Sequence, residues 1–466
     1  MTALERRLGV PGAMVVGLCA MLGAGVFFVW TPAVAVAGQW LWLALVLAAA
    51  VAIANALSTA QLAMRHPVSG GGYAYARAEL SPTTGFAAGW LFLTGKTCSA
   101  AAIALVAASH LWPGWEQPIA IAAIVVLALA NAQGIRVTAW ITWVVVALAL
   151  AGIALALTWT ALGLPSAAGG WAWTAYAPLS DSTFVMAGGE GCSFGLVGGA
   201  EAARAACSDV GALATPAGPL AVLQGAGLLF FAFAGYARMA TLGEEVRDPR
   251  RTLPLAILGA LGIVLAIYAL VAWATTTAYA DAILWPETPV ASLVGDPALH
   301  RVLLVVAAIA CLGSLMGILA GLSRTSLAMA RDGELPGPLA RISARTKAPA
   351  VAEGAMAALA IVLVLVAPPV VLVALSSTSV LAYYGIGHVG ALRMRRTLRL
   401  AAADADSSDG GARRREAWVP AWVSLVGLVL CALLVVTLPW YGVVASALWL
   451  ALALGIRAVR LRRAAD

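Results

Sequence analysis

Long apolar runs separated by short polar segments repeat along the whole chain. Most runs hold about 20 apolar residues, the length that an α-helix needs to cross the hydrocarbon core of a bilayer. The pattern predicts twelve membrane-spanning helices, over residues 12–35, 39–64, 85–111, 117–134, 137–162, 217–242, 253–278, 302–330, 349–367, 369–392, 418–437 and 439–458.

Two polar or glycine-rich segments divide this series. A Gly/Ala-rich stretch at 163–216 predicts a long extracellular loop, and 400–417 predicts a disordered cytoplasmic linker. Five helices fall in 1–162, five in 217–399, and the last two in 418–466 with a cytoplasmic tail. Because five is an odd number, the two sets of five must cross the membrane in opposite orientations.

Composition and charge agree with a membrane protein. Of the 466 residues, 62% are hydrophobic and 11% are charged, whereas an ordinary soluble domain has about 25% charged residues. The net charge of +7 could indicate a nucleic-acid partner, but most Lys and Arg residues fall in segments that are cytoplasmic if the N-terminus is inside. This positive-inside bias predicts a cytoplasmic-membrane protein with both termini in the cytoplasm and no nucleic-acid partner.

Glycines interrupt the first helix of each five-helix set. Gly23 and Gly25 lie in the middle of the first helix, and Gly235 lies in the sixth. Glycine costs about 1 kcal/mol relative to alanine in a helix, and close helix packing is one reason to accept that cost. Paired interruptions in two halves also indicate a transporter's midplane binding site. We therefore expect helices one and six to be unwound at mid-membrane.

Unwound backbone would offer groups that suit a zwitterion. The N–H groups of Ala24, Gly25 and Val26 would face a carboxylate at the positive end of a helix dipole. The carbonyls near Met21 and at 231–234 would accept from an ammonium group. Since free backbone groups cost several kcal/mol each in lipid, a bound α-amino acid would explain the break.

Five segments in order resemble the amino acid–polyamine–organocation (APC) permeases. They are AMLGAGVFF (20–28), HPVSGGGYAYARAEL (66–80), FFAFAGYARMATLGEEVRDPRRTLPLAI (230–257), SRTSLAMARDGELP (323–336) and YYGIGHVGALRMRR (383–396). The resemblance implies an all-α integral membrane fold with a five-plus-five inverted repeat, the LeuT-like arrangement, followed by two further helices. It implies secondary transport of amino acids or polyamines, with no cofactor.

The resemblance also implies a substrate site on helices one, six and eight. Carboxylate contacts would come from the N–H groups of Ala24 and Gly25, and amine contacts from the carbonyls of Met21, Phe231 and Ala234. The full set of substrate-site candidates is Met21, Gly23, Ala24, Gly25, Phe231, Ala232, Ala234, Gly235, Ser314 and Ile318. Phe231 is similar to an aromatic residue that closes over the substrate, and either Tyr383 or Tyr384 could gate from helix ten.

Two charged residues depart from the family pattern. After Gly235 and Tyr236 the family often has Glu, but this chain has Ala237 and then Arg238. Arg238 could act in the cytoplasmic gate, bonding freed carbonyls of helix one, or serve as a structural anchor. Lys96 lies in helix three near mid-membrane, where a charge costs at least about 2.5 kcal/mol, and no acidic residue is expected at its depth.

Lys96 leaves several alternatives open. It could carry a proton during the cycle, replace the cation of sodium-coupled relatives, or pair with the substrate carboxylate. A lysine that extends to the interface is the simpler alternative, but the depth of Lys96 argues against it. A charged Lys96 would disfavour cationic substrates.

These observations predict an amino acid permease that works by alternating access with H⁺, less favourably Na⁺, as the coupling ion. A neutral or small amino acid is the expected substrate. An exchanger of two amino acids, or of an amino acid and a polyamine, fits equally well, and a non-transporting amino acid sensor is a further alternative. The sequence has no HExxH motif, and its four His residues lack metal-ligand spacing, so we expect neither an enzyme nor a metal site.

The six cysteines add one expectation. Cys192 and Cys207 share the predicted extracellular loop, where they could form a disulfide or remain free thiols. The other four lie within predicted helices as small apolar residues.

Overall fold

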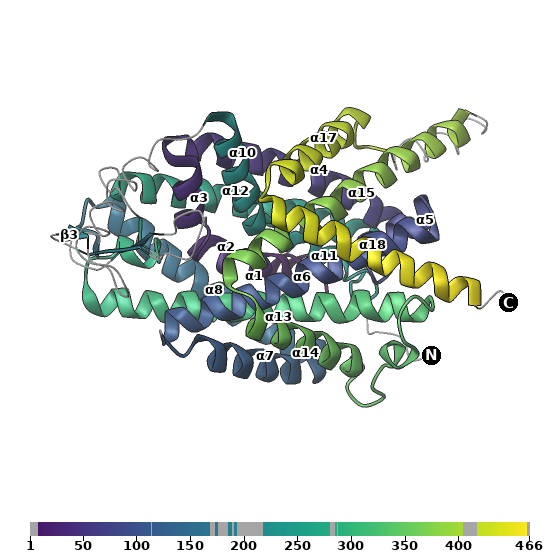
Figure 1. Cartoon of the computed structure of the whole chain (residues 1–466), viewed down its shortest axis with the longest axis horizontal. Coiled ribbons are helices and arrows are strands. Elements are labelled where there is room, and N and C mark those ends of the chain that lie inside the picture. Colours follow the sequence, from purple (N-terminus) through teal and green to yellow (C-terminus); the bar gives the residue numbers. More distant parts are fainter. Residues whose placement is uncertain are drawn as a thin grey trace.

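The structure is a computed structural model that describes residues 8–112, 114–167, 173–175, 185–188, 191–192, 218–279, 285–286, 288–403 and 417–463. It is a bundle of helices that run side by side along one direction (Figure 1). The helices are α1 (Val10–Met21), α2 (Ala24–Phe27), α3 (Trp30–Ala37), η1 (Gly38–Trp40), α4 (Leu41–Arg65), α5 (Gly72–Glu79), α6 (Pro82–Leu111), α7 (Glu116–Ala132), α8 (Ile135–Ala161), α10 (Gly218–Phe233), η3 (Ala234–Tyr236), α11 (Ala237–Ala240), α12 (Pro249–Ala278), η4 (Ala291–Leu293), α13 (Pro297–Arg331), η5 (Gly337–Ala340), α14 (Ala350–Val366), α15 (Pro369–Ala403), α17 (Ala421–Thr437) and α18 (Trp440–Arg463).

The helices agree with the twelve predicted spans. Within the described ranges, eight helical stretches are long and apolar enough to cross a membrane, and four shorter apolar helices accompany them. The chain is therefore an all-helical, multi-pass membrane protein. The boundary of the predicted linker at 400–417 shifts, because α15 continues as a helix to Ala403.

Helix α6 lies at the centre of the bundle. It packs against α13 and α15, and α15 packs in turn against α17. Of the most apolar part of α6, 94% is buried inside the protein, whereas the corresponding shares of α8 and α18 are 39% and 22%. A helix that is buried on every side can carry polar groups only if other helices provide their partners.

The first predicted span is interrupted where the glycines predict it. Helix α1 ends at Met21, the chain passes through Leu22 and Gly23 outside any helix, and α2 begins at Ala24. The break also needs glycine for space, because a Cβ on Gly23 would lie 2.8 Å from the carbonyl oxygen of Ala310 in α13. The predicted break in helix one is confirmed.

The sixth span behaves differently, and here the prediction of an unwound helix is wrong. Helix α10 passes directly into the 3₁₀ turn η3 and then into α11. A 3₁₀ turn keeps backbone hydrogen bonds, so fewer polar groups are set free than by unwinding. Gly235 instead serves close packing, since a Cβ there would lie 2.5 Å from the carbonyl oxygen of Ala20.

The loop between α8 and α10 is described only in short pieces. These form a small antiparallel sheet of β1 (Trp173–Ala175), β2 (Val185–Gly188) and β3 (Gly191–Cys192), in the order β1-β2-β3, with Trp173 opposite Ala187. The expected disulfide falls outside the described residues, because Cys207 is not among them.

Candidate functional site

The break in helix one lies against helices six, seven and eight. A Cβ on Gly25 would meet Ala232 of α10 and Tyr268 of α12, and one on Gly23 would meet Ser314 of α13. The structure thus brings together the predicted residues from helices one, six and eight. Ile318 follows Ser314 by about one turn of α13 and is buried, whereas Phe231 is only partly buried.

Carbonyl groups freed at the end of α1 are met by side-chain hydroxyls. Ser314 Oγ donates to the carbonyl of Ala20 at 3.0 Å, and Tyr268 Oη donates to that of Met21 at 2.6 Å. Tyr268 Oη also lies 3.1 Å from the carbonyl of Ala232. In this conformation Met21, a predicted contact for the substrate amine, therefore has a protein donor.

Tyr268 is a site residue that the sequence analysis missed. Its ring is fully buried and packs against Phe233 and Trp30 at centroid distances of 4.8 and 5.9 Å. A single tyrosine within the long apolar run at 253–278 was the available signal, because a buried tyrosine hydroxyl usually finds a hydrogen-bond partner.

The N-terminal side of α2 leaves backbone donors free. Val26 and Phe27 both direct their N–H groups to the carbonyl of Gly23, at 3.1 and 3.3 Å. Among the residues that the structure describes, the N–H groups of Gly23 and Gly25 have no acceptor. The Gly25 donor belongs to the pair that the sequence assigns to a substrate carboxylate, together with Ala24 at the first position of α2.

Lys96 crosses to helix six. Its Nζ donates to the carbonyl of Ala234 at 2.9 Å, and the side chain is 6% exposed. No acidic side chain in the described parts of the chain pairs with it. The ammonium group therefore binds a carbonyl that the family resemblance assigns to the substrate amine, and the alternative that Lys96 extends to the interface is excluded for this structure.

The two candidate gating tyrosines have different neighbours. Tyr383 Oη accepts from the N–H of Gly72 at 3.0 Å, which ties it to α5. Tyr384 instead stacks on Tyr236 of η3 at 5.2 Å and meets Phe230 edge-on at 5.9 Å. Of the two, Tyr384 therefore contacts helix six at the height of Gly235.

Arg238 differs from its expected surroundings. It does not bond a carbonyl of helix one; its Nη1 donates to Thr241 Oγ1 at 2.6 Å. Glu245 follows Arg238 by seven residues, nearly two turns of a continuous helix, but the helix ends at Ala240 and the chain continues in turns. Arg238 Nη2 consequently lies 3.9 Å from Glu245 Oε2.

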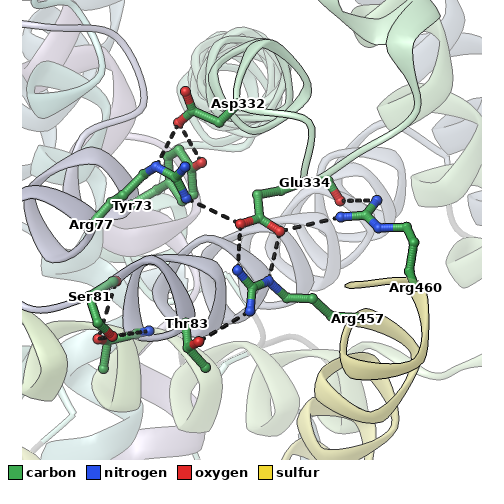
Figure 2. Close-up of polar contacts among 9 residues, drawn as sticks. Tyr73, Arg77, Ser81, Thr83, Asp332, Glu334, Arg457 and Arg460 are labelled. Atoms are coloured by element: carbon green, nitrogen blue, oxygen red, sulfur yellow. Dashed lines mark hydrogen bonds and ion pairs between the residues drawn. The ribbon is translucent and has the colours of Figure 1, made fainter. Parts of the chain in front are cut away.

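A second polar feature joins three segments at the arginine-rich end of the bundle (Figure 2). Arg457 of α18 makes a bidentate pair with Glu334, with distances of 2.7 and 2.8 Å, and Arg77 of α5 lies 3.1 Å from the same carboxylate. Burial alone would raise the pKa of Glu334, but the hydrogen bonds and charge of Arg457, with the charge of Arg77, outweigh it and hold this pKa below its ordinary value. These contacts hold the end of α18 in place rather than forming part of the substrate site.

Comparisons with known proteins agree with this architecture. The sequence profile of a family described as "Amino acid permease" matches residues 8–456. An uncharacterised transporter of Mycobacterium tuberculosis is 40% identical over 99% of this chain and 93% of its own length. The vacuolar cationic amino acid transporter 4 of Arabidopsis thaliana is 28% identical over 76% of this chain and 58% of its own. The branched-chain amino acid permease BcaP of Bacillus subtilis is 26% identical over 77% and 74%.

A solved structure shares the fold. It is the substrate-bound outward-open state of a Na⁺-coupled sialic acid symporter, with a TM-score of 0.53, 13% sequence identity and coverage of 95% of this chain and 90% of its own. The fold is that of a multi-pass membrane protein, and the family match identifies it as a transporter. The chain belongs to the amino acid permease family, and it is not an enzyme.

Proposed function

We propose that the protein moves a neutral amino acid across the membrane by alternating access around the break in helix one. One observation carries the proposal. The break in helix one, where the N–H groups of Gly23 and Gly25 are free, lies close to the carbonyl of Ala234, which accepts a hydrogen bond from Lys96. The two groups of five helices, 1–162 and 217–399, are the proposed inverted repeat, followed by helices α17 and α18.

Orientation in the membrane follows from charge. The end of the bundle that carries Arg77, Arg331 and Arg457 is rich in arginine. By the positive-inside rule this end faces the cytoplasm, so both termini are cytoplasmic in the proposed topology.

The substrate class follows from the position of Lys96. A substrate ammonium near the Ala234 carbonyl would lie close to the ammonium of Lys96, and two like charges repel strongly in a buried site. An amino acid with a second positive charge would add to that repulsion. The names of two relatives differ in substrate class, since one is a cationic amino acid transporter and the other a branched-chain amino acid permease. Lys96 favours a branched-chain or another neutral amino acid.

The proposed coupling ion is H⁺, with Lys96 as the group that gains and loses it. A charged lysine forms a stronger hydrogen bond to a carbonyl than a neutral one. Loss of the proton from Lys96 would therefore weaken its hold on Ala234 and free η3 to move. Exchange of two amino acids without net proton movement remains the second candidate, because the same contact could be broken by substrate alone.

Uptake of radiolabelled amino acids into proteoliposomes, with and without a pH gradient, tests the proposal. We expect Lys96→Met to retain exchange of internal for external amino acid but to lose accumulation driven by the pH gradient. Lys347→Met is the matched control, since Lys347 is the only other lysine in the sequence. Gradient-driven accumulation in Lys96→Met equal to that of the wild type would refute the role of Lys96. Binding without uptake of any amino acid would identify a sensor.

A further inference from the structure

A buried group of four charges lies away from the substrate site, near the place where α7, α13 and α14 pack together and α11 contacts α13. Its members are Arg238, Glu245, Arg324 and Glu353, and each is at most 6% exposed. Arg324 Nε lies 2.9 Å from Glu245 Oε1. The charges of Arg324 and Arg238 both act on Glu353. We call these four residues the charge cluster.

The charges of the cluster balance. Two guanidinium groups face two carboxylates, so the set is neutral when both glutamates are ionised. Without the charge of Glu353, two buried arginines would share the single carboxylate of Glu245. An uncompensated buried charge is strongly destabilising, so the cluster depends on the ionised form of Glu353.

The two arginines are held unequally. Arg324 makes a close pair with Glu245, whereas Arg238 lies 3.9 Å from Glu245. Arg238 Nε and Glu245 Oε2 have no hydrogen-bond partner within the described ranges. Arg238 is therefore held more by the net charge around it than by direct bonds to Glu245.

Arg238 also connects the cluster to the break in helix one. It lies in the short helix α11, which follows η3 directly. In the same helix, the Met239 side chain fills the space beside Gly17 of α1, and in η3 Gly235 contacts the carbonyl of Ala20. A shift of α11 would therefore change the contacts of helix one.

We propose that Glu353 is a proton-binding site, and that its protonation releases Arg238, and with it α11, from the charge cluster. The proton adds to a carboxylate oxygen of Glu353 and gives a neutral carboxylic acid, and no bond breaks. The cluster then carries one net positive charge, and Arg238 and Arg324 repel each other in a medium of low dielectric constant. Acidification thus loosens α11.

The surroundings of Glu353 favour this assignment. The positive charges that act on it come from Arg324 of α13 and, least strongly, from Arg238 of α11, and Glu245 lies within 4 Å of both arginines. Helix α7 contributes the neutral amide of Asn131, whose Nδ2 donates to Glu353 Oε1 at 2.7 Å. An ionisable residue at such a place inside a membrane protein is a candidate functional site, and no other part of the proposed transport cycle uses it.

Infrared difference spectroscopy of the reconstituted full chain tests the proton site without any substrate. Between about pH 8 and about pH 5, where a perturbed carboxyl group can titrate, we expect the wild type to gain the C=O stretching band of a protonated, buried carboxyl group. Glu353→Gln should lose the band, and Glu334→Gln, which removes a buried carboxylate outside the charge cluster, should keep it. A band of wild-type size in Glu353→Gln would overturn the proposal.

A second pair of variants tests the link to Arg238. Arg238→Gln removes a positive charge that acts on Glu353, so we expect the band to form at a higher pH; an unchanged midpoint would overturn the release of Arg238. If Glu353→Gln alone does not fold, the double variant Arg238→Gln/Glu353→Gln keeps the cluster neutral. That double variant must also lack the band.

The connection of this site to the gate rests on the proposed function, and a transport assay separates the two. In proteoliposomes at equal internal and external pH, we expect the wild-type exchange rate to change at least about threefold over the same pH range, and that of Glu353→Gln to stay constant. If the exchange rates of the wild type and of Glu353→Gln depend equally on pH, the link between Glu353 and the transport cycle is refuted. A band that depends on Glu353 in a protein that exchanges no amino acid would support the proton site and refute the transport function.

Discussion

The hydroxyl of Tyr268 offers the sharpest test of how the break in helix one is stabilised. Tyr268→Phe removes one oxygen atom and leaves the ring, which packs against Phe233 and Trp30. The carbonyl of Met21 then loses the hydrogen bond of 2.6 Å, and the carbonyl of Ala232, 3.1 Å from the same hydroxyl, loses its weaker share of that single proton. Both carbonyls are buried where neither water nor lipid can replace the donor.

The expected cost follows from these two contacts. A buried acceptor left without a partner costs about 1–3 kcal/mol. The Met21 carbonyl lies at the end of α1, so its loss of a donor lowers the free energy of unfolding by that full amount. The longer contact to the Ala232 carbonyl adds about 0.5–1.5 kcal/mol to this loss. The sum is about 1.5–4.5 kcal/mol, which corresponds to a fall in apparent Tm of roughly 1.5–4.5 °C for a protein of 466 residues.

Thermal unfolding of the detergent-purified protein measures this difference. Tyr384→Phe is the matched control, because Tyr384 is also buried but in the described part of the chain no backbone carbonyl accepts from its hydroxyl. We expect the control to stay within about 1 °C of the wild type. Equal, small shifts for Tyr268→Phe and Tyr384→Phe would show that the Met21 carbonyl does not need the hydroxyl.

Two further predictions concern packing and charge. In Gly25→Ala the new Cβ would lie 2.8 Å from the backbone Cα of Ala232. We therefore expect the free energy of unfolding to fall by about 1–3 kcal/mol and the yield of monodisperse protein to fall with it. Gly262→Ala is the control and should lose no stability, because no atom lies within 4 Å of its new Cβ. Because the pKa of Glu334 is lowered in the folded protein, its ionised form stabilises the fold above its unfolded pKa of about 4.3, and this contribution is lost as the pH falls through the lower, folded pKa. The difference in apparent Tm between wild type and Glu334→Gln should therefore be present at neutral pH and shrink below about pH 4; a constant difference down to that pH would contradict it.

Local patterns predicted the helices and the break in helix one well. The apolar runs are long enough to define the spans, and the Gly23–Gly25 pair marks a place where the helix ends. The same reasoning failed at Gly235, because a glycine that opens a helix and a glycine that allows two helices to touch look identical in sequence. Only the approach of Ala20 to Gly235 distinguishes them.

Partners of the polar groups could not be predicted, because they come from distant parts of the chain. Tyr268 is 247 residues from Met21, and Lys96 is 138 residues from Ala234. Glu353 was missed for a related reason. It lies in the first turn of its helix, where sequence alone suggests an exposed acidic residue, and it is buried only because α7 and α13 pack over it.

The three donors at the crossing of helices one and six are not equivalent. Ser314 and Tyr268 hold carbonyls of α1 through neutral hydroxyls, which are suited to remain in place throughout a cycle. Lys96 holds the Ala234 carbonyl through a charged group, and a substrate ammonium is the same kind of donor. We therefore expect a bound amino acid to compete with Lys96 at Ala234 and to leave the Met21 carbonyl with Tyr268. On this reasoning the substrate amine contacts helix six, and helix one serves the carboxylate through the N–H of Gly25.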